Sequence, residues 1–123
     1  MRLLLDTHVA IWWLSGDSRL STATRKAIED APNAFVSAVS LWELLIKQDT
    51  GRLDLPTGFA DALRVDFIEL PLTFDHALAG RALPLVHRDP FDRMLVAQAK
   101  VEALTIVTAD RMLAEYGVPV LSA

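Results

Sequence analysis

Short runs of apolar residues, separated by stretches of helical character, constrain the fold of this chain more than any other feature. The first run, Leu3 to Leu5, is apolar at every position and does not alternate with polar residues. A strand with this pattern is typically buried on both faces, as in the parallel sheets of α/β proteins. Pro119 places the last run at an edge of the sheet, where a missing backbone N–H is tolerated. The predicted strands cover residues 2–6, 34–37, 67–70, 104–107 and 118–121.

The stretches between these runs carry helix start signals. Ser21 and Thr73 have hydroxyls that accept a hydrogen bond from the first turn of a helix, and Asp89 followed by Pro90 is a stronger signal of the same kind. Pro56 is likewise expected at the first position of a helix. The predicted helices cover residues 8–14, 22–31, 40–49, 56–66, 74–81, 90–102 and 109–115. Because strands that alternate with helices pair in parallel, we predict an α/β fold, a three-layer α/β/α sandwich with a mostly parallel five-stranded sheet.

Length and composition restrict the class of protein. A chain of 123 residues is expected to form a single domain over residues 1–123. The absence of cysteine excludes disulfides and thiolate zinc sites and suits a reducing cytoplasm. No run approaches the roughly 20 apolar residues of a membrane span, so we expect a cytoplasmic protein without a membrane partner. A net charge of −4 is not that of a general nucleic-acid binder, so a polyanionic substrate would need a local basic patch or a metal ion.

Four acidic residues are attached to apolar elements that are far apart in the sequence. Asp6 ends the first predicted strand and Asp110 follows the fourth, so both are expected at the carboxyl edge of the sheet, where such folds bind ligands. Glu43 lies in an apolar helical stretch, and Asp92 lies in the first turn of the helix over residues 90–102. If these elements pack side by side, the four carboxylates converge on one place.

Each acid taken alone also has a purely structural explanation. Asp6 and Asp110 can cap the helices that follow them, and an acid at position 92 favours the dipole of its helix. Glu43 precedes Lys47 by four residues, and the two can form a weak ion pair on the helix surface. The functional hypothesis therefore depends on the joint placement of the four acids.

The electrostatic cost of such a cluster predicts a bound cation. Two carboxylates about 4 Å apart repel by about 1 kcal/mol in water and by about 4 kcal/mol at an effective dielectric near 20. Several carboxylates at a partly buried site must therefore be protonated or neutralised by a cation. With hard oxygen ligands and no cysteine, Mg²⁺ or Mn²⁺ is the natural choice, and these ions suit phosphodiester hydrolysis because they activate a bound water.

The four acids lie within stretches that match a known family. The stretches are LLLDTH at residues 3–8, VSAVSLWE at 36–43, HRDPFDRMLVAQA at 87–99 and TIVTAD at 105–110. In these stretches the chain resembles the PIN-domain ribonucleases, and specifically the VapC-type toxins of toxin–antitoxin systems. The resemblance implies a PIN-like fold with an endoribonuclease site that uses Mg²⁺ or Mn²⁺ and leaves 5′-phosphate and 3′-hydroxyl ends.

The resemblance also implies roles for individual residues and for partners. Asp6, Glu43 and Asp92 match the three core acids of catalysis and metal binding, and Asp110 matches a fourth, more variable acid. Three hydroxyl residues match positions that can hydrogen-bond the acids or a metal-bound water: Thr7, Ser40 and Thr108. The implied partners are an RNA substrate, a VapB-like antitoxin that blocks the site, and a second copy of the chain in a homodimer.

Several residues beside these motifs are candidates for RNA contact. The candidates are His8, His87, Arg88 and Arg93. A histidine near a helix start is also typical of a structural role, and arginines at a helix start are also typical of solvated charge. Trp12 and Trp13 are adjacent and point in different directions on a helix, which predicts one in the core and the other near the surface at a candidate interface.

Two other functions fit the sequence less well. A phosphatase with Asp6 as its nucleophile would need a partner acid two residues later, where His8 stands. A catalytically degenerate PIN fold that binds only RNA or a protein is the second alternative. The complete set of four acids argues against it.

Overall fold

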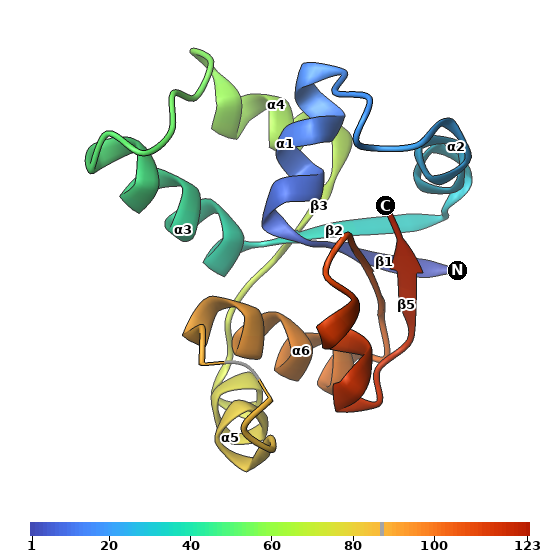
Figure 1. Cartoon of the computed structure of the whole chain (residues 1–123), viewed down its shortest axis with the longest axis vertical. Coiled ribbons are helices and arrows are strands. Elements are labelled where there is room, and N and C mark those ends of the chain that lie inside the picture. The colour runs from blue at the N-terminus through green and yellow to red at the C-terminus, as the bar shows by residue number, and fades with distance from the viewer. Residues whose placement is uncertain (87) are drawn as a thin grey trace.

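The structure, a computed structural model, describes residues 1–86 and 88–123 (Figure 1). These residues form a five-stranded sheet in the order β3-β2-β1-β4-β5, in which all neighbouring strands are parallel. The strands are β1 (Arg2–Leu5), β2 (Asn33–Ser37), β3 (Ile68–Leu70), β4 (Thr105–Thr108) and β5 (Val120–Ser122). The helices are α1 (Thr7–Ser15), α2 (Thr22–Asp30), α3 (Ala38–Asp49), α4 (Phe59–Asp66), α5 (Phe74–Ala82), α6 (Pro90–Glu102) and the 3₁₀ helix η1 (Arg111–Tyr116). The predicted parallel α/β sandwich is therefore confirmed.

The sheet lies between two helical layers, and β1 at its centre explains the wholly apolar run. Leu3, Leu4 and Leu5 are all 0% exposed. Leu3 and Leu5 belong to the core that α1 to α4 cover, whereas Leu4 belongs to the core under α6 and η1. Figure 1 shows these two groups of helices on opposite faces of the sheet, with α5 packed on the outside of α6. Each leucine buried in this way contributes roughly 1.5–3 kcal/mol of transfer free energy.

The predicted caps form as the sequence indicates. The Ser21 hydroxyl accepts from the backbone N–H of Thr24 at 3.1 Å, and the Asp89 carboxylate accepts from the N–H of Phe91 at 2.9 Å. Thr73 and His76 cap each other at the start of α5, because the hydroxyl of Thr73 accepts from the N–H of His76 and the His76 ring accepts from the N–H of Thr73. These local signals fix the starts of α2, α5 and α6.

Two predicted boundaries were wrong for local backbone reasons. α4 begins at Phe59, not at Pro56, because Gly58 adopts a left-handed conformation (φ 79°) that a right-handed helix cannot include. The carbonyl of Pro56 accepts from the N–H of Phe59 in a turn before the helix. The element after β4 is a 3₁₀ helix and starts at Arg111, because Thr108 still belongs to the strand and Asp110 is the N-cap.

The adjacent tryptophans do not divide into core and surface as predicted. Both Trp12 and Trp13 are half-buried at the end of α1. The guanidinium groups of Arg19 and Arg25 lie 5.0 Å from their respective ring centroids. Trp13 also donates through Nε1 to the Asp66 carboxylate at 2.9 Å. Stacked arginines thus cover ring faces that the core does not reach.

Across residues 1–86 and 88–123, the helices are all too short or too polar to cross a membrane.

Candidate active site

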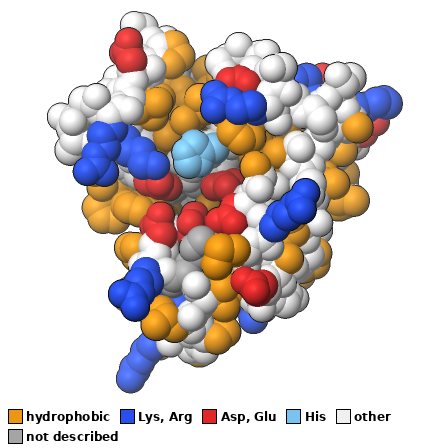
Figure 2. Space-filling view, viewed as in Figure 1, with side chains coloured by type: hydrophobic (Ala, Val, Ile, Leu, Met, Phe, Trp, Pro, Cys, Tyr) orange, Lys and Arg blue, Asp and Glu red, His pale blue; other side chains and the backbone are white. Residues whose placement is uncertain are grey.

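The strand order brings the elements that carry the four acids to one edge of the sheet. Asp6 directly follows β1 and Asp110 follows β4, and these two strands are neighbours. Glu43 lies on α3, which follows β2 on the other side of β1, and Asp92 lies in the first turn of α6. Figure 2 shows acidic side chains gathered in a hollow in the middle of this face, beside a histidine and with basic side chains around them.

The Asp6 carboxylate does not cap the helix that follows it. Asp6 occupies the N-cap position of α1, yet its side chain makes no capping hydrogen bond. Its Oδ2 instead accepts from the Thr108 hydroxyl at 2.7 Å. The same hydroxyl accepts from the backbone N–H of Asp110 at 3.0 Å, so Thr108 links the ends of β1 and β4. The structural explanation of Asp6 as a helix cap is therefore wrong.

The Asp110 carboxylate, in contrast, does cap a helix. Its Oδ1 accepts from the N–H of Met112 at 2.9 Å in the first turn of η1. This bond uses one lone pair of a carboxylate that has room for several. Capping thus accounts for an acid at position 110 without a catalytic role.

The Glu43 carboxylate is both ion-paired and buried. Its Oε2 lies 2.9 Å from Nζ of Lys47, so the ion pair considered from the sequence does form. The residue is nevertheless only 6% exposed, and its Oε1 accepts from the Thr7 hydroxyl at 3.0 Å. A surface i,i+4 pair needs neither burial nor a second partner. The ion pair alone therefore does not explain this position.

Burial makes the ionised form of Asp6 costly. Desolvation raises the pKa of Asp6 above its ordinary value of 3.8, and the nearby charge of Glu43 raises it further. The hydrogen bond from Thr108, the charge of His8 and the backbone of Thr7 act in the opposite direction. The hydrogen bond from the Thr7 hydroxyl to Glu43 places the Glu43 carboxylate next to the residue that follows Asp6. A cation bound here would remove the excess negative charge.

The chemistry of the acids suits a hard cation, although no metal-binding geometry is already formed among the described residues. Among residues 1–86 and 88–123, no three histidine or acidic side chains are arranged to hold a metal ion as they stand. The donors that the sheet edge offers are all oxygens, which suits Mg²⁺ or Mn²⁺. The Ser40 hydroxyl, one turn before Glu43, is buried and has no hydrogen-bond partner in the described part of the chain. A ligand or a water molecule at the site would supply the hydrogen-bond partner that this hydroxyl lacks.

The residues predicted to contact RNA have different environments. Arg93 donates to the carbonyls of Pro84, Gly80 and Leu83 at 2.8, 3.2 and 3.2 Å, so its guanidinium closes the end of α5. Arg88 is exposed just before the N-cap of α6. His8 is exposed beside Asp6, with its ring centroid 6.3 Å from that of Trp12. His87 lies outside the described residues.

Sequence reasoning missed an aromatic pair at this edge. Trp42, next to Glu43, and Phe91, next to Asp92, have ring centroids 5.6 Å apart. Their contact places the first turn of α6 beside α3 and so brings Asp92 to the side of the site that carries Glu43. Their positions directly before two motif acids were the available signal.

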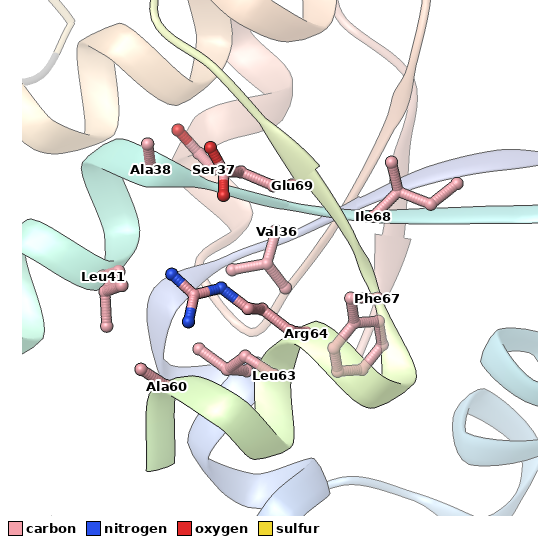
Figure 3. Close-up of a pocket in the computed structure, with 10 residues that line it drawn as sticks. All are labelled: Val36, Ser37, Ala38, Leu41, Ala60, Leu63, Arg64, Phe67, Ile68 and Glu69. Carbon is pink, nitrogen blue, oxygen red and sulfur yellow. The ribbon is translucent and has the colours of Figure 1, made fainter. Parts of the chain in front are cut away.

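The pocket with the clearest apolar lining lies away from the acids. It has a volume of about 170 Å³ and is enclosed by α3, α4 and the ends of β2 and β3 (Figure 3). Leu41, Leu63 and Phe67 line it, and Arg64 extends across it. None of the four acids contributes to its wall, so this pocket is not the candidate active site.

The fold and the site together define a parallel α/β domain with carboxylates gathered at the carboxyl edge of its central strands. The family model described as PIN domain matches residues 3–119, so the chain belongs to the PIN domain family. The chain is 36% identical over 121 residues to Ribonuclease VapC22 of Mycobacterium tuberculosis, a match that covers 95% of this chain and 93% of that protein.

Solved structures share the fold. VapBC2 from Rickettsia felis bound to a promoter DNA fragment contains a chain with a TM-score of 0.72 and 11% identity, covering 99% of this chain and 98% of that one. The structure of FitAB bound to a DNA fragment contains a chain with a TM-score of 0.72 and 18% identity. The match covers 98% of this chain and 94% of that one. FitAcB from Neisseria gonorrhoeae contains a chain with a TM-score of 0.66 and 21% identity. The match covers 97% of this chain and 96% of that one.

Proposed function

We propose that this chain is an endoribonuclease that hydrolyses RNA phosphodiester bonds with Mg²⁺ or Mn²⁺ and that it is the toxin of a toxin–antitoxin pair. The observation that carries the proposal is the Asp6 carboxylate, which is buried, close to Glu43 and not used as a helix cap. Membership of the PIN domain family and the relative named Ribonuclease VapC22 support the same activity.

We propose that Asp6, Glu43 and Asp92 hold the cation, with Asp110 in a supporting role because its carboxylate caps η1. When bound, the cation would supply an activated water and neutralise charge that develops on the phosphate. Thr108 holds the carboxylate of Asp6 in place, as its short hydrogen bond fixes one oxygen. Thr7 and Lys47 likewise fix the two oxygens of Glu43.

Local positive charge, not net charge, would hold the substrate. Lys47, His8 and Arg88 are the cationic or protonatable groups that we propose for contact with RNA. Lys47 is held at the site by Glu43, and His8 is exposed beside Asp6. We do not propose Arg93, because its guanidinium already binds three carbonyls.

We propose a VapB-like antitoxin as the protein partner, together with a homodimer of this chain. The similar solved structures include a VapBC2 assembly and a FitAB assembly, each bound to DNA, which supports a partner of that kind. Co-expression with a candidate antitoxin should abolish RNA cleavage. A stable complex without inhibition would contradict a blocking role.

The test is cleavage of RNA by purified protein with Mg²⁺ or Mn²⁺. Asp6→Asn and Asp92→Asn should remove most cleavage while circular dichroism shows an unchanged fold, and mapped products should carry 5′-phosphate and 3′-hydroxyl ends. The proposal fails if the wild type cleaves no RNA and both variants behave like it in cells.

A role restricted to binding is the second candidate. It is favoured by the absence, in the described part of the chain, of three acids already arranged around a metal position. Calorimetric titration with Mn²⁺ separates the two functions. RNA binding without any metal affinity would select the binding role.

A further inference from the structure

An aromatic pair stands directly beside the acids, where a polyanion binder would be expected to present charge. Trp42 precedes Glu43 on α3, and Phe91 precedes Asp92 on α6. The two ring planes meet at 68°, an edge-to-face arrangement, with centroids 5.6 Å apart. The pair joins two helices that pack against each other near their N-terminal ends (Figure 1).

Trp42 keeps an open ring face in this arrangement. It is 61% exposed, whereas Glu43, the next residue, is 6% exposed. In an edge-to-face pair, the ring that uses its edge leaves both of its faces open, and the ring that offers one face leaves the other open. In either case Phe91 leaves at least one face of the Trp42 indole uncovered. Such a face is a stacking surface for a flat, uncharged ring system.

We propose that Trp42, supported by Phe91, stacks on an unpaired nucleobase next to the phosphate that is cleaved. This inference rests on the proposed ribonuclease function. A base inside a duplex has both faces covered by its neighbours, so only an unpaired base can stack on a side chain. The Lys47 ammonium group, held at 2.9 Å from Glu43 on the same helix, supplies a cation for the adjoining phosphate.

A protein partner would use more of α3 than a base would. Leu45 and Ile46 follow Trp42 at helical spacing and are 41% and 38% exposed. A partner helix would cover all three side chains, whereas a base beside Glu43 reaches only the one that adjoins the acids. The greater exposure of Trp42 and its pairing with Phe91 favour the base. Leu45 and Ile46 therefore serve as matched controls on the same face.

The experiment measures RNA affinity apart from cleavage. In an Asp6→Asn background, a short labelled single-stranded RNA is titrated and followed by fluorescence anisotropy. Trp42→Ala should weaken binding by roughly five- to 140-fold, the range for loss of one base–aromatic stack. Trp42→Phe should keep most of the affinity, and Leu45→Ala and Ile46→Ala should change it by less than about two-fold. A duplex of the same sequence should show no dependence on position 42.

A second measurement locates the stacked base. A single abasic nucleotide is moved along the RNA, and the affinity is measured with and without Trp42→Ala. At one position the abasic RNA should bind weakly to both proteins, because the stack is already absent. The inference is overturned if Trp42→Ala binds RNA as tightly as its parent, or if the substitution lowers the affinity by the same factor wherever the abasic nucleotide is placed. It is also overturned if Leu45→Ala and Ile46→Ala lose as much RNA affinity as Trp42→Ala and sedimentation shows that all three substitutions disrupt a dimer.

The two proposals fail separately. Cleavage by the wild type together with Trp42-independent binding removes the stacking proposal alone. Trp42-dependent RNA binding without any metal-dependent cleavage removes the ribonuclease proposal and leaves base stacking as a binding function. Failure to bind any single-stranded RNA overturns the stacking proposal directly.

Discussion

Replacing Thr108 with valine removes one hydroxyl that serves both Asp6 and Asp110. The hydroxyl donates to Oδ2 of Asp6 at 2.7 Å and accepts from the N–H of Asp110 at 3.0 Å. Valine has nearly the same size, so the change deletes two hydrogen bonds without opening a cavity. A hydrogen bond to an ionised group contributes about 1.5–3 kcal/mol, and the half-buried N–H of Asp110 adds up to about 1 kcal/mol. We expect the free energy of unfolding to fall by about 1.5–4 kcal/mol near pH 7.

The pH dependence of this loss identifies its cause. The Thr108 hydrogen bond favours ionised Asp6, whose folded-state pKa is raised by burial above 3.8. Below about pH 3 the carboxyl is protonated in both proteins, so the charge-assisted part of the difference disappears. Urea unfolding of the wild type, Thr108→Val and Thr108→Ser near pH 7 and near pH 3 measures this, with serine keeping the hydroxyl as the control. A Thr108→Val loss under about 0.5 kcal/mol near pH 7, or an equal loss at both pH values, would refute the reasoning.

Three further changes test the site from other sides. Because burial raises the folded-state pKa of Asp6, the folded state binds the extra proton, and the contribution of Asp6 to stability falls as the pH rises from about 3.8 through that pKa. Asp6→Asn should remove this fall. Thermal unfolding should therefore show the variant to be more stable than the wild type near pH 7 and nearly equal to it near pH 3. A variant that is less stable than the wild type near pH 7 would contradict this expectation. Lys47→Met leaves the buried Glu43 without its counter-charge and should lower the free energy of unfolding in urea by about 1–2 kcal/mol. This loss is smaller than for a fully buried ion pair because the lysine is partly exposed to solvent. Arg93→Met leaves three carbonyls without their donor and should lower the free energy of unfolding by about 1–2 kcal/mol. RNA affinity in the anisotropy assay should not change. A large loss of affinity would show that Arg93 contacts RNA after all.

Signals that act within a few residues could be read from the sequence. The caps at Ser21, Thr73 and Asp89 bind backbone N–H groups two or three residues away, and all three formed. The missed start of α4 is local as well, because the left-handed Gly58 overrides the proline signal at position 56. Local backbone chemistry accounts for these successes and for this failure.

The choice between functional and structural explanations of the acids was not local. Asp6 and Asp110 are both N-cap residues by sequence, yet only Asp110 uses its carboxylate as a cap. The difference arises because the Thr108 hydroxyl, 102 residues away from Asp6, is brought to it by the pairing of β1 with β4. A distant donor thus outcompetes the nearby N–H groups, which sequence spacing alone does not reveal.

The sequence by itself determined which residues could take part: an apolar strand that must be buried on both faces, and four acids tied to apolar elements. The parallel sheet then decided their surroundings, because strand order sets which side chains meet across many residues. It joined Thr7 to Glu43 across 36 positions, turned Arg93 toward α5, and set Trp42 against Phe91. Desolvation and hydrogen bonding both depend on such neighbours. Desolvation makes ionised Asp6 costly, and the hydrogen bond from Thr108 partly offsets that cost and engages the carboxylate away from the helix cap.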